Sequence, residues 1–250
     1  EGSGGGLLFD LATGTATTER DLGRELVAAR PVAGHNGLYA LIDTNGALGF
    51  VQAMYPISFQ SGARVVTPRL ADAFEDDWFA VGRPDSAEAY DVHYAGQQLL
   101  VATLAGRTVT VSQFRDVEAG LYLDEPRQAE FTVGRDYDYL VFGPRGLWLY
   151  LISASGDFEL LDLARPLEPR SRYSGRVTGG DARVSAVAPL LGRYSLIVGD
   201  DRGRVTQWFL VREEGGYELT PIRTFQARAA AARIVPEQRR KGFAVIDVEG

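Results

Sequence analysis

A repeated hairpin pattern constrains this chain more than any other feature. An apolar run, a short polar turn ending in glycine and a second strand-like run recur along the sequence, and glycine supplies the positive φ at which two strands reverse. The turn glycines are separated by 60, 50, 47 and 47 residues and are Gly46, Gly106, Gly156, Gly203 and Gly250. The sequence therefore predicts a series of antiparallel hairpins at nearly regular spacing.

The spacing of these hairpins is typical of a β-propeller, in which each four-stranded blade occupies about 40–50 residues. The longer first interval requires an insertion, which we place in the polar stretch 73–91. Residues 241–250 end like the first strand of a hairpin, and residues 4–22 supply a second strand and an outer one. We expect one all-β propeller domain over residues 1–250, with a flexible Gly-rich start at 1–6. It should have about five to seven blades, one of them shared between the N- and C-termini.

Helical signals are sparse. The alanine-rich stretch 227–233 has good helix propensity, but Pro236 would end a helix almost where it began. We therefore interpret this stretch as a linker that enters an inner strand at 231–236.

Composition and charge exclude several functional classes. Hydrophobic residues make up 45% and charged residues 24% of the chain, which is typical of a folded globular protein. The net charge is −7, and residues 1–120 carry 8 basic and 15 acidic side chains, which argues against a nucleic-acid partner. The chain has no Cys, so disulfides, thiolate catalysis and Cys-ligated zinc are excluded. No apolar run approaches the length of about 18 residues that a membrane span needs.

Candidates for catalysis or metal binding are few. His35 lies in a turn context and His93 near a strand, and no G-x-S-x-G motif accompanies them. The acidic sequence GDDRG offers only Asp200 and Asp201, whereas a calcium loop needs several oxygen ligands at set spacing. We predict that GDDRG is a hairpin turn, that the protein is not an enzyme, and that it needs neither a cofactor nor a metal.

Two clusters are candidate binding sites. An acidic group in the expected insertion, followed by a tryptophan, is either a solvated loop or a partner contact with the ring as its anchor. A cationic run near the C-terminus is either a solvated turn or a contact for an anionic surface. The first cluster consists of Glu75, Asp76, Asp77 and Trp78, and the second of Arg239, Arg240 and Lys241.

Several segments resemble WD-type propeller repeats. Phe9-Asp10 and Leu161-Asp162 are similar to the Trp-Asp pair that ends such a repeat, and Trp208-Phe209 departs from it. Residues 224–250 are similar to a complete WD motif, except that Arg228 stands where His is usual. The resemblance implies a WD40-like propeller in which the polar network supported by that His is in question.

Residues 55–70 and 236–250 resemble the large extracytoplasmic domain of some proteobacterial phosphate ABC transporter permeases of the Pst type. The resemblance implies a docking or regulatory module on the periplasmic face of the bacterial inner membrane. Its partners would be the membrane domain of the parent permease and a periplasmic phosphate-binding protein. The alternative is a stand-alone propeller enzyme or small-ligand binder that uses the central channel.

Overall fold

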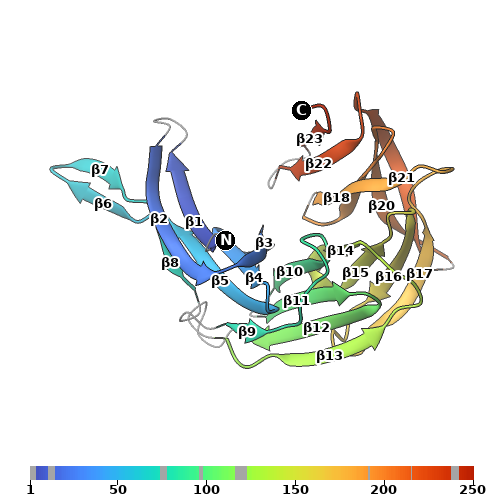
Figure 1. The fold of residues 1–250 in the computed structure, drawn as a ribbon, viewed down its shortest axis with the longest axis horizontal. Helices are drawn as coiled ribbons and strands as arrows, with labels where there is room; N and C mark the ends of the chain where they lie inside the picture. Colours follow the sequence, from blue (N-terminus) through green and yellow to red (C-terminus); the bar gives the residue numbers. More distant parts are fainter. Residues whose placement is uncertain are drawn as a thin grey trace.

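The computed structural model is an arc of antiparallel β-sheets arranged around a common centre (Figure 1). It describes the chain except for residues 1–3, 11–14, 74–77, 96–97, 116–122, 191, 215 and 238–241. Successive sheets follow one another in sequence order, and each is entered by its innermost strand. This arrangement confirms the prediction of an all-β propeller.

Four sheets within the described part of the chain are full blades. The first blade has the order β3-β4-β5-β8, with β9 also paired to β5: Leu26–Pro31, Leu38–Asp43, Ala47–Met54, Arg69–Asp72 and Phe79–Ala80. The second runs from β10 to β13: Tyr90–Ala95, Gln98–Ala105, Thr108–Arg115 and Arg127–Thr132. The third runs from β14 to β17, with the 3-10 turn η2 after β14: Tyr139–Phe142, Pro144–Gly146, Trp148–Ile152, Asp157–Asp162 and Arg170–Arg176. The fourth runs from β18 to β21: Val184–Leu190, Ser195–Asp200, Arg204–Glu213 and Gly216–Gln226.

The two ends of the chain form separate two-stranded sheets. The hairpins are β1–β2 (Gly4–Asp10 and Thr15–Arg24) and β22–β23 (Ala231–Pro236 and Phe243–Asp247). The linker and inner strand expected near residues 227–236 are therefore confirmed. Together the two hairpins hold the four strands of one further blade, but they lie on opposite sides of the opening in the arc (Figure 1). Joining them would give the fifth, shared blade that the sequence predicts.

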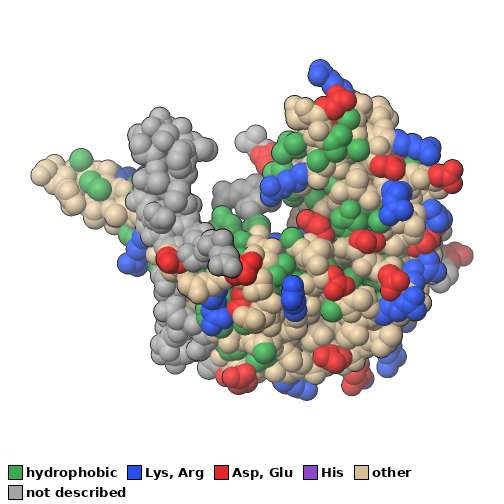
Figure 2. All heavy atoms as spheres, viewed as in Figure 1, with side chains coloured by type: hydrophobic (Ala, Val, Ile, Leu, Met, Phe, Trp, Pro, Cys, Tyr) green, Lys and Arg blue, Asp and Glu red, His purple; other side chains and the backbone are tan. Residues whose placement is uncertain are grey.

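The extra length of the first repeat is only partly where the sequence places it. Residues 78–89 carry β9 and a connecting loop, and residues 74–77 lie outside the described part of the chain. A second insertion lies upstream, where β6 (Ile57–Gln60) and β7 (Ala63–Val66) form a two-stranded hairpin of their own. This hairpin projects beyond the blades (Figures 1 and 2). The alternation of apolar residues in this hairpin is the same sequence pattern that a strand packed within a blade shows.

The hydrophobic core lies between successive blades. Leu38, Ile42 and Phe50 of the first blade pack with Val92 and Phe114 of the second. Equivalent clusters join the second blade to the third, the third to the fourth, and the fourth to β22–β23. The second strands β11, β15 and β19 are almost entirely buried because each is paired on both edges and covered on both faces. At the centre, β3, β10, β14, β18 and β22 lie side by side in that order.

The GDDRG sequence forms the turn between β19 and β20, as predicted. The Asp200 carboxylate is buried and accepts hydrogen bonds from the backbone N–H groups of Arg202 and Arg204, at 3.0 and 2.8 Å. Asp43 makes the same pair of bonds to Asn45 and Ala47 in the corresponding turn of the first blade. These aspartates hold a tight turn by satisfying backbone donors.

We expect Gly203→Ala to lower the free energy of unfolding by about 2 kcal/mol or more. Gly203 has a φ of +75°, and an added Cβ would lie 2.6 Å from the carbonyl oxygen of Ala229. Gly180→Ala is the control, because Gly180 also has a positive φ (+61°) but has no atom within 4 Å of the added Cβ. Urea denaturation measures both variants, and equal losses would show that crowding at Gly203 has no effect.

No helix in the described ranges is long and apolar enough to span a membrane.

Candidate functional site

Most of the binding residues expected from sequence lie outside the described part of the chain. This applies to Glu75, Asp76 and Asp77 and to Arg239, Arg240 and Lys241. Their roles stay predictions.

Trp78 is described, and its ring is engaged within the first blade. The ring lies directly against Gly49, where an added Cβ would come within 2.6 Å of a ring atom. The guanidinium carbon of Arg24 stands 4.2 Å from the ring centroid, and Arg24 also pairs with the buried Asp43 at 2.6 Å. A partner could therefore reach only part of this half-buried side chain.

A buried carboxylate lies at the centre of the arc. Asp91, on β10, is 2% exposed. Its Oδ1 accepts a hydrogen bond from the backbone N–H of Val92 at 2.9 Å, and its Oδ2 accepts one from the N–H of Phe142 at 2.8 Å. Because Phe142 is on β14, the carboxylate connects the inner strands of the second and third blades.

Arg193 completes this cluster from the fourth blade. It follows β18 and has a φ of +71°, and its Nη1 donates to the Phe142 carbonyl at 3.0 Å and to Oδ2 of Asp91. Its Nη2 donates to Oδ1 of Asp91 at 3.1 Å. We call Asp91, Phe142 and Arg193 the axial clamp, because together they tie three blades at the centre.

The electrostatics of the axial clamp favour the charged pair. Burial by itself raises the pKa of Asp91, but the charge and hydrogen bonds of Arg193 outweigh it and hold this pKa below its usual range. A buried ion pair of this kind persists only when hydrogen bonds satisfy the remaining polar atoms. The Phe142 N–H and carbonyl group provide those bonds.

His93 lies beside the axial clamp without a polar partner. The residue is 7% exposed, and neither ring nitrogen has a hydrogen-bond partner. It packs against Gly146 of η2, and its ring centroid lies 6.3 Å from that of Phe142. Burial and the neighbouring Arg193 charge lower the pKa of His93 to about 4, so the ring is neutral at physiological pH.

A second polar group joins the first two blades. Arg30, on β3, donates from Nη2 to the Ala87 carbonyl at 2.6 Å and to Glu88 Oε2 at 2.8 Å. Its guanidinium carbon lies 5.3 Å from the centroid of the Tyr90 ring. Arg30 is therefore already engaged by neighbouring groups. Within the ranges that the structure covers, no group of three or more His, Asp or Glu side chains could hold a metal ion.

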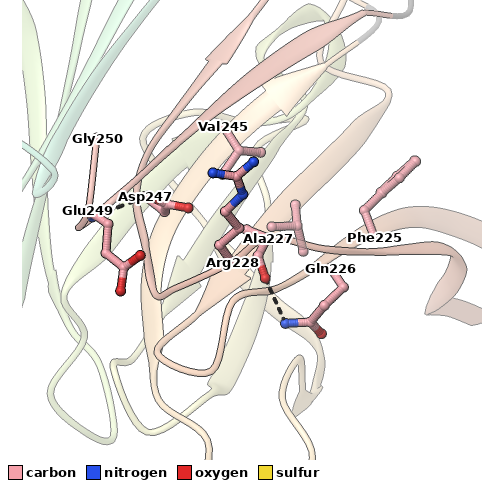
Figure 3. Close-up of a pocket in the computed structure, with 9 residues that line it drawn as sticks. Phe225, Gln226, Ala227, Arg228, Val245, Asp247, Glu249 and Gly250 are labelled. Atoms are coloured by element: carbon pink, nitrogen blue, oxygen red, sulfur yellow. Dashed lines mark hydrogen bonds between the residues drawn. The ribbon is translucent and has the colours of Figure 1, made fainter.

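An open groove lies beside the C-terminal hairpin (Figure 3). It has a volume of about 490 Å³. Phe225 and Gln226 at the end of β21 line one part of it, and Val245, Asp247 and Glu249 line another. Arg228 also lines the groove, so apolar surface and side chains of both charges occur together there.

An uncovered strand adjoins this groove. β23 pairs only with β22 among the described strands, whereas the corresponding second strands of the full blades are paired on both edges. Ile246, on β23, is 45% exposed, and Val248 just after it is 67% exposed. Free backbone donors and acceptors on such an edge can pair with an extended segment.

Sequence reasoning missed the axial clamp. Asp91 and Arg193 are 102 residues apart and share no motif. The one local signal was an arginine directly after Gly192 in a turn, which does not identify its partner. The sequence suggests a packed or half-exposed side chain near a strand for His93, and the structure shows the packed alternative, with 7% of the residue exposed.

Comparisons with known proteins support the fold. No protein-family model matches the chain, and neither does any curated protein. Among solved structures, the β-propeller domain of Cps50 (Swd1) from Myceliophteria thermophila is 13% identical with a TM-score of 0.55, covering 98% of this chain and 74% of that one. A candidate 6-phosphogluconolactonase from Bacteroides fragilis is 14% identical with a TM-score of 0.53, covering 97% and 69%. A second, from Bacteroides uniformis, is 13% identical with a TM-score of 0.50, covering 91% and 66%. At these identities the similarity establishes the propeller fold alone.

Proposed function

We propose that this propeller is a non-catalytic docking module, the extracytoplasmic domain of a phosphate-type ABC transporter permease at the periplasmic face of the bacterial inner membrane. Its partners are the membrane domain of the parent permease and a periplasmic phosphate-binding protein. The observation that carries the docking role is the groove beside β23, where the exposed apolar ring of Phe225 lies together with the charged side chains of Arg228, Asp247 and Glu249.

The groove has the properties of a polypeptide-binding surface. Phe225 lines the groove and is 43% exposed, so it can lose water-accessible apolar area when a partner binds there. The edge of β23 that is unpaired among the described strands can bind an extended segment through backbone hydrogen bonds, which is one of the recurring modes of peptide recognition. The β1–β2 hairpin would take this edge instead if the two terminal hairpins joined into the shared blade. The rigid blades behind it keep these groups in place.

The transporter context comes from sequence resemblance. The two segments that carry it, 55–70 and 236–250, correspond to the projecting hairpin and to the β22–β23 region. The described residues of segment 55–70 are mostly exposed, whereas Phe243 and Val245 of segment 236–250 pack against the core between the fourth blade and β22.

Cross-linking and pull-down with the periplasmic phosphate-binding protein test this function. We expect binding that Phe225→Lys weakens at least tenfold, because Phe225 lines the groove, is 43% exposed, and the substitution places a charge on its apolar surface. Leu147→Lys is the matched control, since Leu147 has almost the same exposure (44%) but lies in the third blade. Absence of association at high protein concentration, with the parent membrane domain also present, would remove the proposed partner.

A second candidate function is suggested by His93. A buried imidazole with two unpartnered nitrogens next to the Arg193 guanidinium would suit a small ligand at the centre of the propeller. Two of the similar solved structures are candidate 6-phosphogluconolactonases, which gives this alternative a structural precedent. A thermal-shift screen with phosphate, sugars and divalent ions distinguishes the two functions, because a specific rise of several degrees that His93→Leu abolishes would favour the ligand-binding one.

A further inference from the structure

The β6–β7 hairpin has one strongly apolar face that nothing in the described fold covers. Ile57 and Phe59 alternate along β6 and point to the same side, and their partners across the hairpin are Val66 and Arg64. Ile57 is 53% exposed and Phe59 is 75% exposed. The other face carries small or polar side chains together with one valine: Ser58, Gln60, Ala63 and Val65.

The shape of the hairpin is set by its own turn. Ser61 and Gly62 have φ values of +51° and +80°, the pair of positive angles found in the tight two-residue turns that match strand twist. The hairpin forms a sheet separate from the first blade, so its apolar face does not contribute to a blade core. An isolated two-stranded sheet is only marginally stable in water, and an external contact would stabilise it.

The charge around the hairpin is opposite to that of the rest of the protein. Between Asp43 and Asp72 the sequence contains no Asp or Glu, and its two charged residues are Arg64 and Arg69. The remainder of the chain carries 24 basic and 33 acidic residues (26 − 2 and 33 − 0), a net charge of −9. An acid-free, weakly cationic projection from an acidic domain is complementary to an anionic surface.

Because the hairpin projects, its tip is distant from the acidic side chains of the blades. A strand of four residues is about 13 Å long, which exceeds the Debye length of about 8 Å at physiological ionic strength. Carboxylates on the blades are therefore largely screened from a surface that the tip of the hairpin contacts. Figure 2 shows the hairpin projecting at the left of the molecule, with hydrophobic side chains on a largely uncharged surface.

We propose that the face formed by Ile57, Phe59 and Val66 inserts into the interfacial region of an anionic lipid bilayer, with Arg64 at the lipid phosphates. Aromatic and aliphatic side chains on a surface element bind at the boundary of headgroups and acyl chains, and a nearby cation adds attraction to anionic lipids. Tyr55, which precedes β6 and is 59% exposed, supplies a second aromatic group at the base of the hairpin. This inference does not depend on the transporter context, because it concerns the hairpin alone.

Vesicle co-sedimentation of the 250-residue chain tests the proposal. We expect binding to vesicles that contain phosphatidylglycerol and much weaker binding to vesicles of phosphatidylcholine alone. Ile57→Ser should weaken the binding about tenfold or more, and Arg64→Gln about fivefold on the anionic vesicles only. The matched control is Ile222→Ser, because Ile222 is also an exposed isoleucine (48%) but lies on β21 of the fourth blade.

A fluorescence measurement locates the contact. Phe59→Trp should show a blue shift and quenching by brominated acyl chains, whereas Ile222→Trp should show neither. Absence of binding to phosphatidylglycerol vesicles, or equal quenching of the two tryptophan variants, would overturn the proposal. Self-association that Ile57→Ser abolishes, seen by sedimentation velocity without vesicle binding, would also overturn it and assign the face to a second copy of the chain.

Discussion

Arg193→Ala should lower the free energy of unfolding by about 3–5 kcal/mol at neutral pH. The substitution removes both guanidinium bonds to Asp91 and the bond to the Phe142 carbonyl, and it leaves a carboxylate that is only 2% exposed without its counter-charge. Because burial alone raises the pKa of Asp91, the unpaired carboxyl should titrate above its usual range in this variant. Urea denaturation measures the loss.

Two further variants show whether the buried charge is the cause. Arg165→Ala removes an ion pair to Glu168 in which both side chains are well exposed, and it should cost at most about 0.5 kcal/mol. Adding Asp91→Asn to Arg193→Ala removes the unpaired charge, and the amide oxygen can still accept the bond from the Phe142 N–H. We therefore expect the double variant to be more stable than Arg193→Ala. If the free energy of unfolding of Arg193→Ala lies within about 1 kcal/mol of that of the unmodified chain, the axial clamp is not important for stability.

Local features of the sequence predicted the hairpins well. Asp200 to Gly203 shows why: the aspartate accepts hydrogen bonds from backbone groups two and four residues later, and the glycine adopts a positive φ. Both effects depend on residues that are adjacent in sequence. The strands on either side follow from apolar patterning, so the blade repeat could be predicted from spacing alone.

Contacts between blades could not be predicted in the same way. The axial clamp forms only when the inner strands of three blades converge, and its members come from β10, β14 and the turn after β18. Trp78 shows the same limit, because its contact with Gly49 depends on how β9 returns to β5. Contacts between side chains that depend on how the blades are arranged around the propeller produce no periodic pattern in the sequence.

The β6–β7 hairpin shows a different limit of pattern reasoning. Alternation of apolar and polar residues reports that a strand has an apolar face, but not what covers that face. In β12 the inward residues Val109 and Val111 are fully buried, whereas Ile57 and Phe59 on β6 are exposed. Only the three-dimensional arrangement separates a core strand from a surface that awaits a partner.

Stability should fall as the pH decreases from about 6.5 to about 4, because His93 is neutral in the folded protein. Its pKa is lowered to about 4 by burial and by the Arg193 charge, whereas a histidine in the unfolded chain titrates near 6.5. Between these values the unfolded state binds a proton that the folded state excludes, so protonation favours unfolding. The lowered pKa of His93 should reduce the free energy of unfolding by about 3 kcal/mol in total, and no further loss from this group is expected below its folded pKa.

Urea denaturation between about pH 7 and pH 4 measures this dependence. His93→Leu should flatten it, because the variant has no group at this position to titrate. His35→Leu is the matched control: it removes the chain's other histidine, which is half-buried against the ring of Tyr94 and lies away from Arg193. Asp91, whose pKa is lowered in the folded protein, loses stability only as the unfolded carboxyl begins to bind protons below about pH 5, so the slopes between about pH 7 and pH 5 report on the histidine. An unchanged slope in His93→Leu would show that the buried imidazole has a polar partner in solution that compensates its burial.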